Sequence, residues 1–155
     1  MDIRLATEFD IPGLLSLLLQ VGRVHHDIRP DIFPETTLKY DETALKALLK
    51  DESRPIFVAM VGEFVAGYCF CVHKDYEAGG TSVARRELYV DDLCVDENHR
   101  RQGIAEALYR YATDYAKSCG CSFVTLNVWC GNDGAMKFYE NAGLTPRHIM
   151  MEMKL

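Results

Sequence analysis

Between Leu88 and Trp129 the sequence predicts a strand, a polar turn, a helix and a second strand, and this order constrains the fold more than any other feature. The first strand is apolar and ends at Val95. A helix is predicted from Gly103 to Ser118, because apolar residues recur along it every three or four positions. The second strand is predicted from Phe123 to Trp129. Two strands joined by a helix in this way form a right-handed βαβ unit with a parallel pair.

Earlier segments predict further strands of the same sheet. Gly62-Glu63 turns one strand into the next, and a polar loop with Gly79-Gly80 returns the chain again, so three successive strands should pair antiparallel. A strand from Asp2 to Ala6, a helix opening near Pro12 and a helix from Asp41 to Lys50 precede them. The three antiparallel strands are Pro55–Met60, Phe64–His73 and Arg86–Val95.

The end of the chain predicts one short helix and two more strands. Asn132 or Asp133 caps the helix, Gly143 ends it, and a strand starts at Leu144. The last strand, His148–Leu155, alternates apolar and mostly polar side chains and is suited to pair across a homodimer. We therefore expect one α/β (α+β) domain over residues 1–155, with a mixed central sheet of six to seven strands, an antiparallel N-terminal part, a parallel pair and about four flanking helices.

The strand before the turn changes phase at Asp91-Asp92. Apolar side chains occupy even positions before this pair and odd positions after it. One extra residue in a strand turns every later side chain to the other face, as a β-bulge does, and leaves backbone groups free for a ligand. The alternative is a strand buried on both faces, which Tyr89 and Cys94 permit.

Composition limits the classes of function. The net charge of −6 argues against a general nucleic-acid binder, and an acidic cleft would attract cationic acceptors such as amines. Six cysteines without a basic and apolar leader at Met1 indicate reduced thiols and a cytoplasmic location. None has the spacing of a zinc site, so we expect no metal. The apolar run Leu14–Leu19 is too short to cross a membrane.

The turn itself predicts an anion site. Gly103 and Ala105 leave backbone N–H groups uncovered at the positive end of the helix, where phosphate binds. No Gly-Lys-Ser/Thr follows, which excludes a nucleotide P-loop, and one glycine is too few for a dinucleotide fingerprint. A ligand with a diphosphate and no catalytic metal fits better.

Two motifs in this chain resemble those of the GCN5-related N-acetyltransferase (GNAT) superfamily. Arg100-Arg101-Gln102-Gly103-Ile104-Ala105 resembles its Arg/Gln-x-x-Gly-x-Gly/Ala motif, with alanine where glycine is common. The strand Val90–Val95 resembles its bulged strand, and Asn132–Leu144 resembles its second signature. The resemblance covers essentially the whole chain. It implies a GNAT fold whose parallel pair is splayed at the bulge, with Phe123 beginning the strand that diverges.

The resemblance also implies acetyl-CoA as the cofactor. Backbone N–H groups near the helix start would hold the pyrophosphate, and the strand after the bulge would pair with the pantetheine arm. Asn132 would contact that arm, and Tyr139 would lie near the sulfur. The implied cofactor-binding residues are Leu93, Cys94, Val95, Arg100, Arg101, Gln102, Gly103, Ile104, Ala105, Glu106, Asn132 and Tyr139.

Acetyl transfer to an amine needs a proton acceptor, a polarised carbonyl and an acid for the leaving thiolate. The resemblance makes Asp91 the first choice of base, directly or through water, with Asp92 beside it; the alternative is that Asp91 only binds the amine by charge. It makes the Cys94 N–H the oxyanion donor. Tyr139 matches the acid, and its alternative is a core aromatic beside Phe138. Glu87 and Tyr89 are reserves.

The stretch from His25 to Pro34 mixes rings and charges between prolines. It is interpreted either as a packed connector or as a wall of the acceptor site. The expected substrate-binding residues are His26, Phe33, Tyr89, Asp91 and Asp92. Together the features predict transfer of an acetyl group to a primary amine of a small molecule or peptide. A catalytically silent acyl-CoA-binding sensor or interaction module is the alternative.

Overall fold

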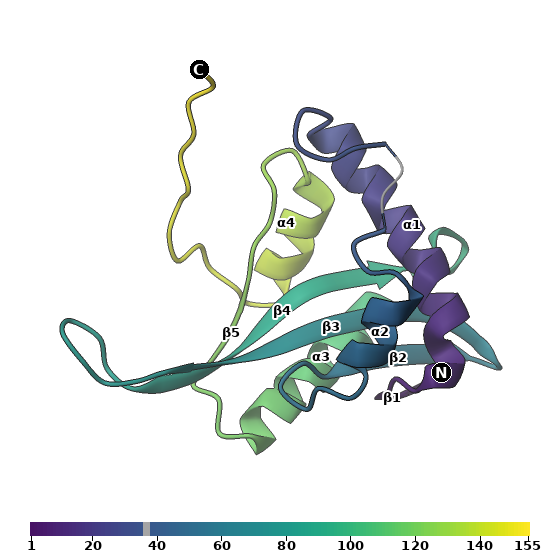
Figure 1. The fold of residues 1–155 in the computed structure, drawn as a ribbon, viewed down its shortest axis with the longest axis horizontal. Coiled ribbons are helices and arrows are strands. Elements are labelled where there is room, and N and C mark those ends of the chain that lie inside the picture. The colour runs from purple at the N-terminus through teal and green to yellow at the C-terminus, as the bar shows by residue number, and fades with distance from the viewer. Residues whose placement is uncertain (36–37) are drawn as a thin grey trace.

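The computed structural model describes residues 1–35 and 38–155, which form one mixed sheet with strand order β1-β2-β3-β4-β5 (Figure 1). The first four strands pair antiparallel, and β4 pairs parallel with β5. The predicted mixed sheet is therefore confirmed, but its predicted size of six to seven strands is wrong, because the structure has five. The strands are β1 (Asp2–Leu5), β2 (Ile56–Val61), β3 (Phe64–Tyr76), β4 (Arg85–Val95) and β5 (Phe123–Leu126).

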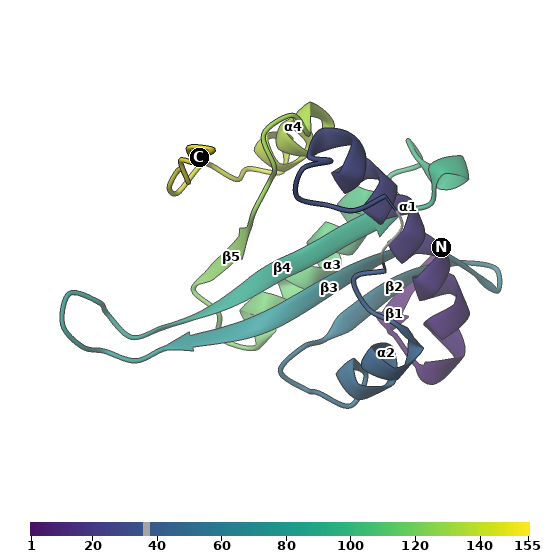
Figure 2. The same ribbon diagram turned by 45° about the horizontal axis from the view of Figure 1, so that its top comes forward.

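Four helices flank the sheet, as predicted: α1 (Ile11–Ile28), α2 (Glu42–Leu48), α3 (Ile104–Ser118) and α4 (Asp133–Asn141). Helices α1 and α2 cover one face and α3 covers the other (Figures 1 and 2), and the rings of Phe138 and Tyr139 on α4 contact Tyr109 of α3. Alternate residues of the central strands serve the two cores: Val58 packs toward α1, whereas Phe57 and Ala59 pack toward α3. Within the described residues, no helix is long and apolar enough to span a bilayer.

Helix α1 is longer than the sequence pattern predicts. The sequence pattern predicts that this helix runs out near Gly22 to Asp27 and that an irregular segment follows. In the structure it continues to Ile28, so His25 and His26 lie on the helix and not in the loop. A single glycine inside a helix costs only about 1 kcal/mol, so Gly22 does not end α1.

The end of the chain differs most from the prediction. Residues 144–155 form neither of the two expected strands and extend away from the body (Figure 1). Ile149 is 78% exposed and Met151 is 85% exposed. A strand exists only through pairing with a neighbour, and alternation of side chains does not say where that neighbour lies. Without such a neighbour, residues 144–155 form neither the sixth nor the seventh predicted strand.

The predicted β-bulge is present. The β3–β4 register pairs Phe70 with Asp92 but Cys71 with Val90, so Asp91 is the extra residue. Pairing between β4 and β5 ends at Val90 and Leu126, while β4 continues to Val95. The two parallel strands are therefore splayed beyond the bulge, and one edge of β4 is left open there.

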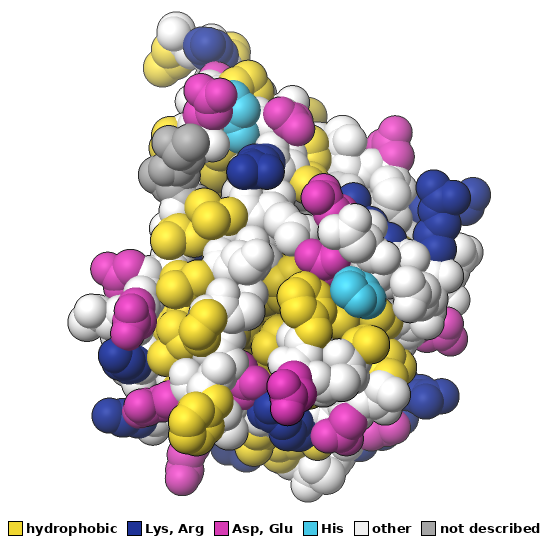
Figure 3. Space-filling view, turned by 90° about the vertical axis from the view of Figure 1, so that its right-hand side faces the viewer, with side chains coloured by type: hydrophobic (Ala, Val, Ile, Leu, Met, Phe, Trp, Pro, Cys, Tyr) yellow, Lys and Arg dark blue, Asp and Glu magenta, His cyan; other side chains and the backbone are white. Residues whose placement is uncertain are grey.

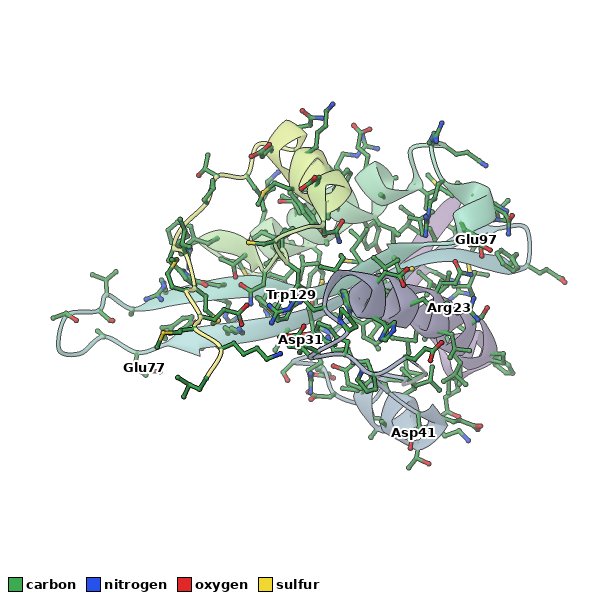
Figure 4. All side chains as sticks on the ribbon, turned by 90° about the horizontal axis from the view of Figure 1, so that it is seen from above. Arg23, Asp31, Asp41, Glu77, Glu97 and Trp129 are labelled. Carbon is green, nitrogen blue, oxygen red and sulfur yellow. The ribbon has the colours of Figure 1, made fainter. Side chains whose placement is uncertain are left out.

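Two further features frame the sheet. The β3–β4 hairpin projects well beyond the body (Figure 2), and Figure 4 places Glu77 at this end and Glu97 at the opposite end of the molecule. On the face shown in Figure 3, acidic and basic side chains are interspersed among apolar ones.

Candidate active site

The start of α3 forms an anion-binding turn. Gly103 has φ +76° and immediately precedes the helix. Within the described residues, no oxygen accepts a hydrogen bond from the N–H groups of residues 103–106. A Cβ built on Gly103 meets no atom within 4 Å, so the space beside Gly103 is open. The positive end of a helix with free N–H groups is suited to phosphate.

A buried carboxylate holds this turn in place. Asp96 accepts hydrogen bonds from the Asn98 N–H at 3.0 Å, from His99 Nδ1 at 3.0 Å and from Gln20 Nε2 at 2.8 Å. These bonds, that from Gln20 first, lower the pKa of Asp96. Sequence reasoning missed both Asp96 and Gln20. An aspartate two residues before asparagine at a turn was the available signal for Asp96.

The open edge of β4 presents its backbone in a definite order. The Asp96 N–H donates a hydrogen bond to the carbonyl oxygen of Ala66 in β3. Hydrogen-bonding direction alternates along a strand, so Cys94 also faces β3, whereas Leu93 and Val95 direct their N–H and C=O groups to the open side. The oxyanion donor expected at Cys94 therefore faces the wrong strand in this register, and Leu93 is the nearest free donor.

The two carboxylates at the bulge have different surroundings. Asp91 Oδ2 accepts a hydrogen bond from Tyr40 OH at 2.9 Å and lies 2.9 Å from Lys39 Nζ. Asp92 Oδ2 accepts one from Tyr68 OH at 2.8 Å. Burial raises the pKa of Asp92, although Tyr68 opposes this. Asp91 is thus already paired with a cation, whereas the pKa of Asp92 lies above its ordinary value. The tyrosines and Lys39 were not predicted.

Tyr139 projects from α4 toward α3. Its ring meets Tyr109 edge-on at 5.9 Å and Phe138 at 5.0 Å. Phe138 also meets Tyr109, so both neighbours contribute to one aromatic group. Within the part of the chain that is described, the Tyr139 hydroxyl makes no hydrogen bond. Burial above all, with the negative field of groups including Asp92, raises its pKa, so the hydroxyl stays protonated.

These elements correspond to a known family of enzymes. A sequence profile described as "Acetyltransferase (GNAT) family" matches residues 23–144. The chain belongs to this family.

Curated relatives and solved structures resemble the chain over part or all of its length. It is 27% identical over 149 residues to an uncharacterised N-acetyltransferase of Methanocaldococcus jannaschii, covering 96% of this chain and 62% of that one. The chain spans only 41% and 30% of the lengths of two further curated relatives. A mutant protein from Bacillus halodurans has a TM-score of 0.96 at 28% identity, covering 100% and 99% of the two chains. An aminoglycoside N-acetyltransferase in complex with CoA shares the fold alone, with a TM-score of 0.74 at 15% identity, covering 99% and 98%.

In this GNAT domain, three rings from α1, the following loop and the segment after β5 form one aromatic group. The Phe33 ring lies edge-on to Trp129 at 5.1 Å and tilted against His25 at 5.1 Å. His26 Nδ1 lies 2.8 Å from Phe33 O, so this histidine holds the loop through its backbone. Figure 4 shows Trp129 and Asp31 near each other in the view from above. Of these residues the sequence predicted His26 and Phe33, whereas Trp129, the single tryptophan after β5, was missed.

Glu87 and Tyr89 on β4, the alternative candidates for the base, contact other side chains. Tyr89 OH accepts a hydrogen bond from Asn127 Nδ2 at 3.1 Å, and Lys74 Nζ lies 3.7 Å from its ring centroid. Glu87 is 1% exposed and pairs with two guanidinium groups. Burial alone would raise the pKa of Glu87, but these groups hold it below its ordinary value. Glu87 is therefore an ion-pair partner and not a free base. The guanidinium groups belong to Arg85 and Arg147.

The helix α4 begins with the predicted asparagine cap. Asn132 Oδ1 accepts a hydrogen bond from the Ala135 N–H at 3.2 Å. The amide nitrogen of Asn132 remains the group that can reach a ligand. Across residues 1–35 and 38–155, no three His, Cys, Asp or Glu side chains are grouped as metal ligands.

Proposed function

We propose that this GNAT domain transfers an acetyl group from acetyl-CoA to a primary amine of a small molecule or peptide, directly in a ternary complex. The observation that carries the proposal is the open edge of β4 from the bulge at Asp91 to Val95, followed one turn later by the free N–H groups of residues 103–106. A diphosphate with an extended arm has this shape and these hydrogen-bonding needs.

The residues present fit the cofactor. The free donors at residues 103–106 and the open space above Gly103 suit the pyrophosphate. Leu93 and Val95 offer alternate backbone groups to an arm lying along β4, like an added strand. When bound, the cofactor supplies a thioester whose acetyl group can pass to an amine. The side chains Arg100, Arg101, Gln102, Ile104, Ala105 and Glu106 border this site.

The proton acceptor is the point where we revise the expectation from the sequence. The Asp91 carboxylate already pairs with Lys39 and accepts a hydrogen bond from Tyr40, so its oxygens are engaged. Asp92 has a raised pKa, because burial disfavours its charge. We assign the base to Asp92, acting directly or through a water, and the binding of the cationic amine to Asp91.

Tyr139 is the proposed general acid that protonates the leaving thiolate. Its raised pKa keeps the proton on the hydroxyl at neutral pH, ready to pass to the leaving sulfur. The Leu93 N–H, in place of that of Cys94, polarises the carbonyl oxygen. The wall formed by Phe33 and Trp129 would orient the acceptor, together with Tyr89. The cytoplasmic setting expected from the sequence belongs to the same proposal.

Release of free thiol tests the function. Purified protein is incubated with acetyl-CoA and a panel of polyamines, aminoglycosides, amino acids and peptides, and CoA is measured against a no-acceptor control. At least one amine should raise CoA release, and the acetylated product should appear by mass spectrometry. Tight acetyl-CoA binding with no release above background would instead support the silent acyl-CoA-binding module.

A further inference from the structure

The Lys39 side chain extends from the segment before α2 to the bulge of β4. Its ammonium nitrogen lies 2.9 Å from Asp91 Oδ2 and donates a hydrogen bond to the carbonyl oxygen of Asp91 at 3.4 Å. Burial raises the pKa of Asp92, and the groups that oppose this rise are Tyr68 first and then Lys39. The Lys39 amine therefore acts on both carboxylates to which the proposed function assigns amine binding and proton acceptance.

Other lysines pair with carboxylates through helix spacing. Lys46 Nζ on α2 lies 2.6 Å from a glutamate oxygen four positions away, and Lys117 Nζ on α3 lies 3.0 Å from an aspartate oxygen three positions away. The pair of Lys39 with Asp91 instead joins positions 52 residues apart, and it ends where pairing between β4 and β5 has stopped. Helix spacing accounts for the first two pairs, whereas the pair of Lys39 belongs to the candidate active site.

The Lys39 amine is able to leave Asp91. The side chain is 41% exposed, and an ion pair at such exposure contributes little to the stability of the fold. Its amine is carried on a flexible four-carbon stem. The proposed function places the acetyl carbonyl at the Leu93 N–H, two residues beyond Asp91 and thus about 7 Å along the strand. Rotation about the side-chain bonds of a lysine spans this distance, so the acetyl group is within reach of Lys39.

We propose that Lys39 is an internal acceptor, acetylated on Nζ by acetyl-CoA bound to the same chain. The step rests on the proposed function: a bond forms between Nζ and the acetyl carbon, the carbon–sulfur bond breaks, and Tyr139 protonates the leaving sulfur. Of the two protons that the ammonium loses, one replaces the proton that Tyr139 gives up, and the other goes to solvent through Asp92. Acetylation removes the charge of the lysine, which releases Asp91 to bind a cationic acceptor.

Mass spectrometry of peptides measures this acetylation. The protein is incubated with ¹³C-labelled acetyl-CoA and no other amine, and the label on each lysine is followed over time. Lys39 should gain label about tenfold or more faster than Lys46 and Lys117, because an amine held in the site reacts as part of one molecule. Its half-time should not depend on the protein concentration. Tyr139→Phe should slow this labelling about tenfold or more.

Two arginine variants form a matched control. Lys39→Arg should remove the fast label, whereas Lys46→Arg should leave the labelling of Lys39 unchanged. Labelling of Lys39 no faster than that of Lys46 and Lys117 would overturn the inference. A half-time that shortens as the protein concentration rises would do the same, because the acetyl group would then come from another copy of the chain.

The protein without cofactor gives an independent readout. Sulfo-N-hydroxysuccinimide acetate labels accessible lysines chemically, and an amine held against a carboxylate is shielded from it. Asp91→Asn should increase the labelling of Lys39 by this reagent and leave that of Lys117 unchanged; equal labelling of Lys39 in both proteins would contradict its placement at the bulge. If an added amine is acetylated and Lys39 is not, the inference fails and the proposed function stands. If Lys39 gains label and no added amine does, the inference stands and the proposed class of acceptor fails.

Discussion

Replacing Gly103 by alanine probes the anion site against a control at the other end of the same helix. Gly103 precedes α3 with φ +76°, and Gly120 follows it with φ +73°. A Cβ built at either position meets no atom within 4 Å. An L-residue in this backbone region costs about 1 kcal/mol. Both substitutions should therefore lower the free energy of unfolding by about 1 kcal/mol, and the Tm by about 3 °C in a chain of this size.

The two variants should differ in cofactor affinity. The methyl group of Gly103→Ala would enter the open space beside Gly103, at the free N–H groups of residues 103–106. Displacing one charge-assisted hydrogen bond costs about 1.5 to 3 kcal/mol, so the Kd for CoA should rise about tenfold to a hundredfold. Gly120→Ala places the same methyl group at the negative end of α3, far from any proposed ligand atom, and should bind CoA as the wild type does.

Isothermal titration with CoA measures the affinities, and thermal melting measures the shared strain. Free pyrophosphate should compete with CoA in the wild type and much less in Gly103→Ala. If Gly103→Ala melts like Gly120→Ala and still binds CoA with wild-type affinity, the pyrophosphate is not held at the start of α3. A loss of affinity in both variants would point to a general effect on folding, and the reasoning would fail.

Three more predictions concern the proposed chemistry and the fold. Tyr139→Phe should lower kcat about tenfold to a thousandfold with little change in CoA affinity, whereas the control Tyr111→Phe, whose ring packs on Phe57 of β2, should keep full activity. Asp92→Asn should lower kcat/KM about a hundredfold and remove the acidic limb of the pH profile; a larger loss in Asp91→Asn would reverse the assignment of the base. The folded pKa of Glu87 is lowered, so its ion pairs stabilise the fold above the unfolded pKa, and this stability is lost as the pH falls through the lower folded pKa. Glu87→Gln should therefore cost about 2 kcal/mol at pH 7 by urea unfolding and flatten this acid dependence; an unchanged dependence would show that the pairs contribute nothing.

Local patterns predicted much of the site. The change of phase at Asp91-Asp92 located the bulge, because one extra residue must invert the alternation of a strand. The small residue at position 103 located the start of α3, because a left-handed backbone there favours glycine. These features depend on neighbours in the sequence, so one sequence suffices to find them.

Contacts between distant segments were not predictable in this way. Gln20 reaches Asp96, and Tyr40 reaches Asp91, only because α1 and the following loop cross the sheet near the end of β4. No periodicity in either segment encodes that crossing. The tail shows the complementary failure: its alternation predicts a strand, but residues 144–155 form none, because a local pattern does not supply the neighbouring strand that pairing needs.

The bulge has a consequence for how this chain can change. Before it, Leu88 and Val90 face the core under α3, and after it Leu93 and Val95 face the same core. Asp91 is the residue that the sheet does not need for pairing. Its side chain can therefore be exchanged without moving a single core residue, whereas deleting it would turn the whole end of β4 inside out. The side chain at position 91 can therefore be selected for chemistry alone. Deletion of the residue is selected against, because it would destabilise the rest of β4.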